Sequence, residues 1–137
     1  MISLKGGTIP PVILVISSNL ETRRMLLRSL KAMGFEAFGA TNGRQGLALI
    51  GMQASKNIGG ILLDLEMFDL EGMAVLHTLQ EQHADIPVIV VSCVSTKERA
   101  EEVLRKGARD YIVKPFDIRL LRDKCLQCFI HPEDNAV

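Results

Sequence analysis

The sequence predicts a doubly wound α/β fold, in which parallel strands alternate with helices that cover both faces of one sheet. Two observations lead to this prediction. Short aliphatic runs alternate along the 137 residues with segments whose apolar residues recur at helical spacing. The aliphatic runs are apolar at consecutive positions, as expected for strands buried on both faces. The length suits one domain, which we expect at residues 11–129, with tails at 1–10 and 131–137.

The first strand and the first helix have clear signals. Residues Pro11–Ile16 are predicted to form a buried strand. Ser18 and Glu21 have the spacing of a capping box, which predicts a helix that begins beside Ser18. Apolar residues then recur at helical spacing: Leu26, Leu27, Leu30 and Met33. Gly34 is predicted to end this helix, because glycine tolerates the left-handed conformation that often follows a helix.

The second strand and helix are predicted from weaker signals. Phe35–Ala40 is predicted to be a short strand, and Asn42 is a suitable N-cap for the helix that follows it. This helix is marked by Leu47, Leu49 and Ile50. Gly46 and Gly51 each lower its intrinsic stability by about 1 kcal/mol relative to alanine. We therefore expect a helix that depends on its packing.

The remaining elements continue the alternation of strand and helix. The third strand, Ile61–Asp64, is predicted to end in a carboxylate, and Met73, Leu76 and Leu79 indicate the next helix. Four further segments complete the pattern. The predicted elements are the strand Val88–Ser92, the helix Thr96–Lys106, the strand Tyr111–Val113 and the helix Asp117–Phe129.

Composition narrows the classes of function. Sixteen Lys and Arg residues balance sixteen Asp and Glu residues, which argues against nucleic acid or an anionic membrane as a partner, because both need clustered positive charge. No apolar run approaches the roughly 18 residues of a membrane span. Three cysteines are too few for a disulfide scaffold, so we expect a cytoplasmic domain. Arg23 and Arg24 are expected on a solvated helix face and not at a phosphate site.

Polar side chains stand where the predicted strands end. In a doubly wound fold the functional crevice lies at the carboxyl ends of the strands. The residues of this sequence that end strands are Ser17–Ser18, Thr41, Asp64, Ser92–Cys93 and Lys114, and we single out Asp64, Ser92 and Lys114. A carboxylate, a hydroxyl and an ammonium at one edge suit an anion that becomes attached to the carboxylate. The structural alternative makes Asp64 a helix N-cap or the partner of a buried lysine. The Lys114–Pro115 step is either a surface turn or a cis peptide that directs the ammonium into the crevice.

Several short motifs follow one another along the chain in a recognisable order. They are Ile13–Ile16 with Arg23–Arg24 and Met33–Phe35, Thr41–Gly43, Leu62–Met67 with Asp69–Gly72, Pro87–Ser92, and Gly107–Phe116. In this order and spacing they resemble the receiver domain of two-component response regulators, over about residues 11 to 129. The resemblance implies a flavodoxin-like sheet with strand order 2-1-3-4-5 and five helices. It also implies a cytoplasmic phosphorelay protein that is a signalling module and not an ordinary enzyme.

The resemblance further implies a role for each residue at the strand ends. Asp64 would accept a phosphoryl group from a phosphohistidine of a sensor histidine kinase or a phosphotransfer protein. Lys114 would contact that phosphoryl group and Ser92 would move toward it. Tyr111 would be the aromatic switch whose rotamer follows Ser92, or, on the structural alternative, a half-buried packing residue. A downstream protein would bind the face formed by the fourth helix, the fifth strand and the fifth helix.

The sequence departs from the family directly after the first strand. Receivers usually carry two adjacent acidic residues there, which hold Mg²⁺, whereas this chain has Ser17 and Ser18. Neutral hydroxyls are poor ligands for magnesium, so Asp64 remains the strongest anionic ligand, beside the backbone carbonyl of Glu66 that the family normally uses. We expect weak Mg²⁺ binding, and either impaired phosphorylation or partner binding that needs no phosphate. Phe68, where the family often has proline, is a smaller departure.

The same sequence allows two other interpretations. A small haloacid-dehalogenase-like phosphohydrolase would use Asp64 as nucleophile and Glu66 as the second acid, but it needs further strand-end acids that the chain lacks. Cys125, Cys128 and His131 have a spacing that suggests a metal site, yet a zinc site usually needs a fourth ligand. We favour two small core cysteines over that metal site.

Overall fold

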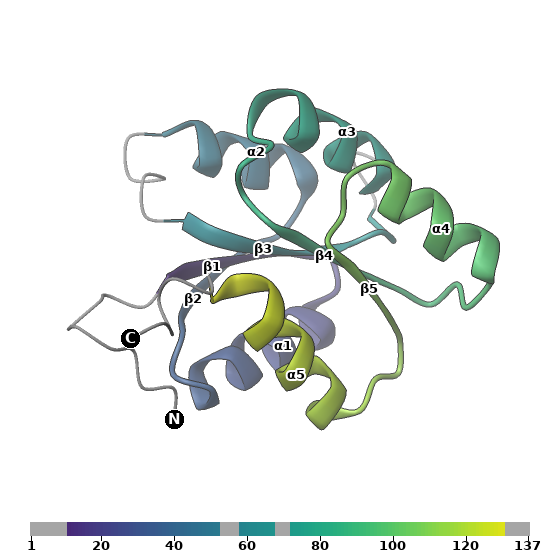
Figure 1. The fold of residues 1–137 in the computed structure, drawn as a ribbon. Coiled ribbons are helices and arrows are strands. Elements are labelled where there is room, and N and C mark those ends of the chain that lie inside the picture. Colours follow the sequence, from purple (N-terminus) through teal and green to yellow (C-terminus); the bar gives the residue numbers. More distant parts are fainter. Residues whose placement is uncertain (1–10, 53–57, 68–71, 131–137) are drawn as a thin grey trace, which may run out of the picture.

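The computed structural model describes residues 11–52, 58–67 and 72–130, and these fold around one five-stranded parallel sheet (Figure 1). The strand order is β2-β1-β3-β4-β5, and every neighbouring pair is parallel. The strands are β1 (Val12–Ile16), β2 (Glu36–Ala40), β3 (Ile58–Asp64), β4 (Val88–Ser92) and β5 (Asp110–Val113). The predicted doubly wound fold and its order 2-1-3-4-5 are confirmed.

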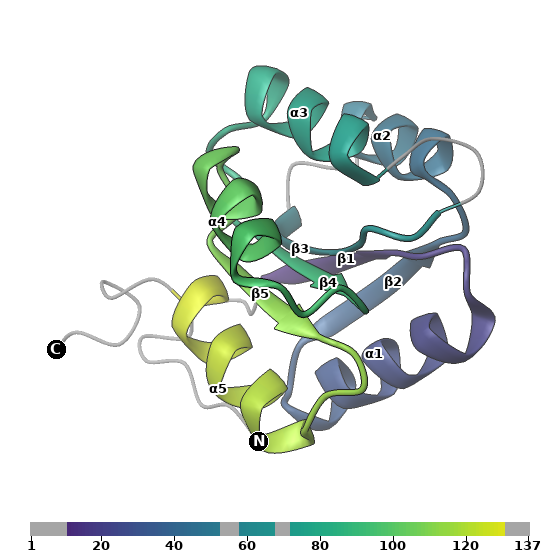
Figure 2. The ribbon, with the colours of Figure 1, turned by 90° about the vertical axis from the view of Figure 1, so that its right-hand side faces the viewer.

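The helices form a layer on each face of this sheet. They are α1 (Leu20–Ala32), α2 (Gly43–Gly51), α3 (Gly72–Gln82), α4 (Lys97–Arg105) and α5 (Ile118–Phe129). Helices α1 and α5 lie on one face, and α2, α3 and α4 lie on the other (Figure 2). None of the helices among the described residues is long and apolar enough to cross a membrane.

The central strands are buried on both faces because their side chains alternate between the two helical layers. In β1, Ile13 and Val15 pack with α1 and α5, whereas Leu14 and Ile16 pack with α2 and α3. Residues 13–16 are fully buried, and so are residues 61–63 of β3 and 88–91 of β4. The consecutive apolar positions of the sequence therefore supply two cores, one on each side of the sheet.

The helix boundaries agree with the sequence at four sites and differ at one. Asn42, Thr96 and Asp117 cap α2, α4 and α5 through their side chains, and Gly34 has a positive φ of 99° just after α1. The capping box predicted at Ser18 is wrong. Asn19 caps α1 instead, because its side chain accepts a hydrogen bond from the Thr22 N–H at 2.8 Å. Ser18 lies one residue outside the cap.

Two glycines are explained by close packing. A Cβ atom on Gly46 would lie 2.6 Å from Ile16 Cδ1, so the glycine that weakens α2 locally is what lets the helix approach β1. A Cβ atom on Gly60 would come within 2.3 Å of the Phe129 ring. Strand β3 begins at Ile58, earlier than the predicted Ile61, and Gly60 pairs with Ile13 of β1 beneath that ring. Nothing in the amino-acid pattern indicates this longer strand, because glycine is usually unfavourable inside a strand.

Candidate functional site

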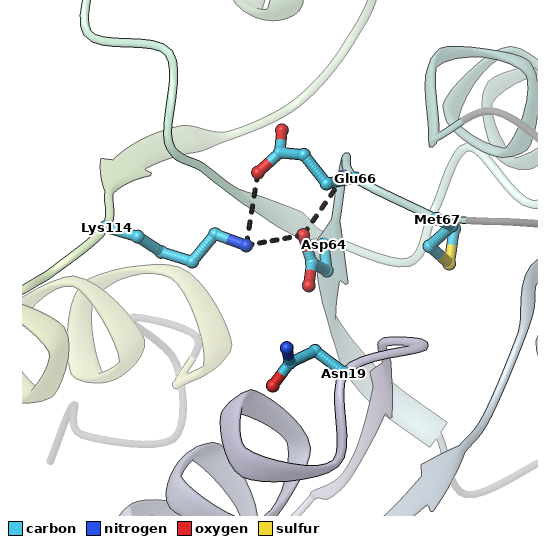
Figure 3. A pocket seen from close by; sticks show the side chains of 5 residues that line it. All are labelled: Asn19, Asp64, Glu66, Met67 and Lys114. Atoms are coloured by element: carbon cyan, nitrogen blue, oxygen red, sulfur yellow. Dashed lines mark hydrogen bonds and ion pairs between the residues drawn. The ribbon is translucent and has the colours of Figure 1, made fainter.

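Polar side chains from four strands meet at the carboxyl edge of the sheet. Asp64 ends β3, Ser92 ends β4, Ser17 follows β1 and Lys114 follows β5. A pocket of about 250 Å³ opens at this edge, lined by Asn19, Asp64, Glu66, Met67 and Lys114 (Figure 3). The structure therefore brings Asp64, Lys114 and Ser17 together, as expected from the strand ends.

The Asp64 side chain is fully buried, and both of its carboxylate oxygens accept hydrogen bonds. Oδ1 accepts from Lys114 Nζ at 2.9 Å and from the Glu66 N–H at 3.1 Å. Oδ2 accepts from Ser17 Oγ at 2.8 Å. A buried carboxylate without such partners would be strongly unfavourable. Asp64 is thus the partner of a partly buried lysine, which was the structural alternative, and it also borders the pocket.

The two serines after β1 have different surroundings. Ser17 is fully buried, its Oγ donates to Asp64, and the same Oγ accepts from the Asn19 N–H at 3.2 Å. Ser18 Oγ is buried without a hydrogen-bond partner. Arg23 donates to the backbone carbonyl of Ser17 at 2.8 Å and is half-buried, so its predicted placement on a solvated helix face is wrong. Arg24 is exposed, as predicted.

Lys114 supplies the cationic group of the site. The Lys114–Pro115 peptide is cis, which was one of the two predicted alternatives. Lys114 Nζ lies 2.9 Å from Asp64 Oδ1 and 3.1 Å from Glu66 Oε1. Partial burial lowers the pKa of the Lys114 ammonium, but the two carboxylates outweigh it, so the pKa is raised above its usual value. Lys114 therefore stays charged in every ordinary buffer.

The side chain of Glu66 makes contacts that sequence reasoning missed. Its Oε2 accepts from Ser92 Oγ at 2.7 Å, and its Oε1 accepts from the Cys93 N–H at 2.9 Å. Partial burial raises the pKa of the carboxyl, but the hydrogen bonds from Ser92, Cys93 and Lys114 outweigh it and lower the pKa overall. The position two residues after Asp64 drew attention to Glu66, but nothing in the sequence indicates that its side chain turns toward β4.

Ser92 is linked to Tyr111 through the backbone of Val94. Ser92 Oγ donates to Glu66 and accepts from the Val94 N–H at 3.1 Å. The Tyr111 hydroxyl donates to the Val94 carbonyl, and its ring packs at the edge of the core shared with α3 and α4. The two residues that the family resemblance pairs as a switch are therefore connected in the structure by hydrogen bonds.

The cysteines show no metal site in the described part of the chain, where no cluster of three or more His, Cys, Asp or Glu residues could hold an ion. Cys125 is buried in the core, where burial raises the pKa of its thiol to about 12, and Cys128 is half-buried. Cys93 is exposed. His131, the third member of the suggested metal motif, and Phe68 lie outside the described residues.

The carboxylate oxygens at the pocket, which are the candidate ligands for Mg²⁺, are already engaged in hydrogen bonds. Mg²⁺ prefers several hard, usually anionic oxygen ligands, but both oxygens of Asp64 already accept hydrogen bonds. Glu66 is bound to Ser92 and Cys93 of β4 and its following loop, with Lys114 between the two carboxylates (Figure 3). Ser18 Oγ is a buried oxygen with no partner, but it is neutral. A lysine ammonium thus stands where a cation would neutralise the carboxylates.

Comparison with known proteins shows that the chain is similar to response regulators. The chain matches the response regulator receiver domain over residues 13–126. Regulatory protein AtoC of Escherichia coli (strain K12) is 35% identical over 106 residues, which cover 77% of this chain and 22% of AtoC. A putative NtrX-like response regulator of Rickettsia typhi is 32% identical over 119 residues, which cover 82% of this chain and 24% of the relative. The chain spans about a quarter of the length of these curated relatives.

Solved structures share the fold. The receiver domain of the Francisella response regulator 1452 superposes with a TM-score of 0.76 and 29% identity, covering 83% of this chain and 92% of that chain. A chain in the CheX–CheY–BeF3–Mg²⁺ complex from Borrelia burgdorferi superposes with a TM-score of 0.83 and 24% identity, covering 90% of this chain and 92% of that chain. At that identity the second likeness concerns the fold alone.

Proposed function

The chain belongs to the family of response regulator receiver domains, and we propose that Asp64 is its phosphoacceptor, beside a magnesium site weakened by Ser17 and Ser18. Receiver domains are signalling domains that interact with histidine kinases or phosphotransfer proteins, and they generally bind Mg²⁺ at the phosphorylation site. The contact that carries this proposal is the 2.9 Å hydrogen bond from Lys114 Nζ to Asp64 Oδ1, beside an open pocket.

The proposed transfer uses Asp64, Lys114 and Ser92 at the carboxyl edge of the sheet. An oxygen of Asp64 attacks the phosphorus of a phosphohistidine, so that an oxygen–phosphorus bond forms and the phosphorus–nitrogen bond breaks. The electron pair of the broken bond stays on the imidazole nitrogen, which then takes a proton. The Lys114 ammonium stabilises the negative charge on the phosphoryl oxygens, and the Ser92 hydroxyl is the second donor within this edge.

We infer the weakness of the magnesium site from the neutral hydroxyls of Ser17 and Ser18, which replace two acidic ligands. The metal normally supplies charge stabilisation worth several kcal/mol in phosphoryl transfer, and here Lys114 is the cation beside Asp64. We therefore propose slow phosphorylation and partner binding that proceeds without it, through the face of α4, β5 and α5. We also propose that residues 11–129 form the domain, that it works in the cytoplasm, and that it acts as a signalling module and not as a phosphohydrolase.

The direct test is mass spectrometry of the intact protein after incubation with a small-molecule phosphodonor and Mg²⁺. A phosphate-sized adduct is expected to form slowly and to vanish in Asp64→Asn. Ser17→Asp/Ser18→Asp is expected to speed the reaction and to tighten Mg²⁺ binding in a titration. If the unchanged protein binds Mg²⁺ tightly, the weakened site is refuted. If an adduct also forms in Asp64→Asn, or if none forms in any variant, the phosphoacceptor role is refuted.

The phosphohydrolase alternative is tested by a separate turnover assay. Such an enzyme needs the second acid free to act on the leaving group, whereas Glu66 is bound to Ser92, Cys93 and Lys114. Turnover of a generic phosphate ester that depends on Asp64 would favour the enzyme over the signalling module.

A further inference from the structure

The carboxylate of Glu66 is surrounded by hydrogen-bond donors from two other strand ends. Ser92 Oγ lies 2.7 Å from Oε2, and the Cys93 N–H and Lys114 Nζ lie 2.9 and 3.1 Å from Oε1. One donor is a hydroxyl, one a backbone N–H and one an ammonium. Three convergent donors of this kind form a binding site for an oxyanion.

The same donors would be needed by a phosphoryl group on Asp64. Lys114 Nζ already bridges the carboxylates of Asp64 and Glu66, so anything bound to Asp64 on the pocket side meets the same ammonium (Figure 3). Strands β3 and β4 are neighbours, and Val91 of β4 pairs with Asp64 of β3. Ser92 is the next residue after Val91. Glu66 therefore occupies donors that an incoming oxyanion at this edge would require.

We propose that the Glu66 carboxylate is the resident oxyanion of this receiver, and that it positions Ser92 and, through Val94, Tyr111 without a phosphoryl group. The proposal rests on the proposed function only in naming the phosphoryl group as the competitor. Glu66 acts through Ser92, so it is a positioning residue and takes no part in bond making.

Glu66 is connected to Tyr111 through the Ser92 hydroxyl, which has only one proton to donate. Ser92 is fully buried and has a single hydroxyl proton, which it gives to Glu66. Its lone pairs are then free to accept from the Val94 N–H, and the Val94 carbonyl accepts the Tyr111 hydroxyl. Without the carboxylate of Glu66, the Ser92 hydroxyl must donate to another acceptor. This changes the hydrogen bond from the Val94 N–H to Ser92, and with it the position of the Tyr111 side chain.

Charge explains why a phosphoryl group and Glu66 compete. Asp64 and Glu66 already share one ammonium at 2.9 and 3.1 Å. A phosphoryl group on Asp64 adds negative charge beside a carboxylate that holds the same donors, and like charges at this range repel. Phosphorylation therefore requires Glu66 to leave its three donors.

Tyr111 offers a clean readout because the chain has one tyrosine and no tryptophan. The protein is labelled with 3-fluorotyrosine, and the single ¹⁹F resonance is recorded for the unchanged protein, Glu66→Ala, and Glu81→Ala as a control for loss of an exposed glutamate on α3. We expect the resonance to move in Glu66→Ala and to stay in place in Glu81→Ala. Excess sodium formate, which supplies a free carboxylate, should return the resonance of Glu66→Ala, whereas sodium chloride of equal ionic strength should not.

Two results would overturn the proposal while circular dichroism shows an intact fold. One is a Tyr111 resonance that does not move in Glu66→Ala. The other is a moved resonance that formate leaves unchanged, because the carboxylate would then not be acting as a bound oxyanion.

A second measurement separates this proposal from the phosphoacceptor role of Asp64. With a phosphodonor and Mg²⁺, Glu66→Ala should gain the phosphate adduct roughly tenfold faster than the unchanged protein, which corresponds to about 1.4 kcal/mol of activation free energy. Equal rates would overturn the competition between Glu66 and the phosphoryl group. If neither protein forms an adduct, the role of Asp64 fails, and the resonance of Tyr111 still decides the role of Glu66.

Discussion

Removing the Lys114 ammonium is the strongest test of how the site is held together. In Lys114→Met, the fully buried Asp64 keeps the hydrogen bonds from Ser17 Oγ and the Glu66 N–H but loses its ion pair with Lys114. Removing one partner of a buried ion pair costs about 3–5 kcal/mol. Because two hydrogen bonds remain, we expect the lower end, a loss of about 3 kcal/mol in the free energy of unfolding.

The assay is urea denaturation followed by circular dichroism, with a matched control elsewhere in the fold. Lys124 pairs with Asp110 at 2.8 Å, and both side chains are 24% exposed, whereas that of Asp64 is fully buried. Lys124→Met should therefore cost only about 1 kcal/mol, as more solvated ion pairs do. In the Asp64→Asn background, Lys114→Met should cost less than about 1 kcal/mol, because no buried charge remains without its partner.

Two outcomes would refute this account of Lys114. One is a loss in Lys114→Met that is no larger than the loss in Lys124→Met. The other is an equal loss in the presence and absence of the Asp64 carboxylate, which would mean that Lys114 stabilises the fold by its packing and not by its charge.

Three further predictions follow from the contacts described above. Glu66→Gln should speed the alkylation of the exposed Cys93 by iodoacetamide at pH 8, because the hydrogen bond and the charge of Glu66 raise the pKa of that thiol. An unchanged rate would contradict this, and the buried Cys125 should stay unreactive as an internal control. Because the pKa of Glu66 is lowered in the folded state, its carboxylate contributes stability above pH 4.5, and this contribution is lost as the pH falls through the lower pKa of the folded state. The urea midpoint of Glu66→Gln should therefore fall less steeply than that of the unchanged protein from pH 6 downward, and parallel curves would contradict this prediction. Gly60→Ala should lower the free energy of unfolding by about 1–3 kcal/mol, because the added methyl group meets the Phe129 ring; truncating the ring in Phe129→Leu should recover part of that loss, and a neutral Gly60→Ala would refute the close approach.

The fold could be predicted because its determinants are local. Residues 13–16 and 88–91 are apolar at every position, and such runs need a helix layer on each face of the sheet. Asn42, Thr96 and Asp117 cap their helices with their own side chains, so their roles are visible within a few residues of sequence. The strand order came from the resemblance to receivers, because the alternation of strands and helices does not fix which strands are neighbours.

The errors and omissions lie where distant residues decide the outcome. Three residues with cap chemistry stand in a row at 17–19, and which of them caps α1 depends on Asp64, which lies 47 residues from Ser17 and accepts its hydroxyl proton. Arg23 was misplaced for the same reason, because its partner is the carbonyl of Ser17 at the strand end. The direction of the Glu66 side chain depends on donors at Ser92, Cys93 and Lys114.

The serine after β1 changes the electrostatics of the site in two ways at once. An aspartate at position 17 could only accept hydrogen bonds, so its carboxylate beside that of Asp64 would need a cation between the two. Ser17 removes that requirement and also donates, at 2.8 Å, to the Asp64 oxygen that Lys114 does not reach. The Lys114 ammonium, the Ser17 hydroxyl and the Glu66 N–H thereby all donate to the buried carboxylate. Ser17 therefore links the loss of the acidic pair to the hydrogen bonding of Asp64, and this link supports the proposal of a weakened magnesium site.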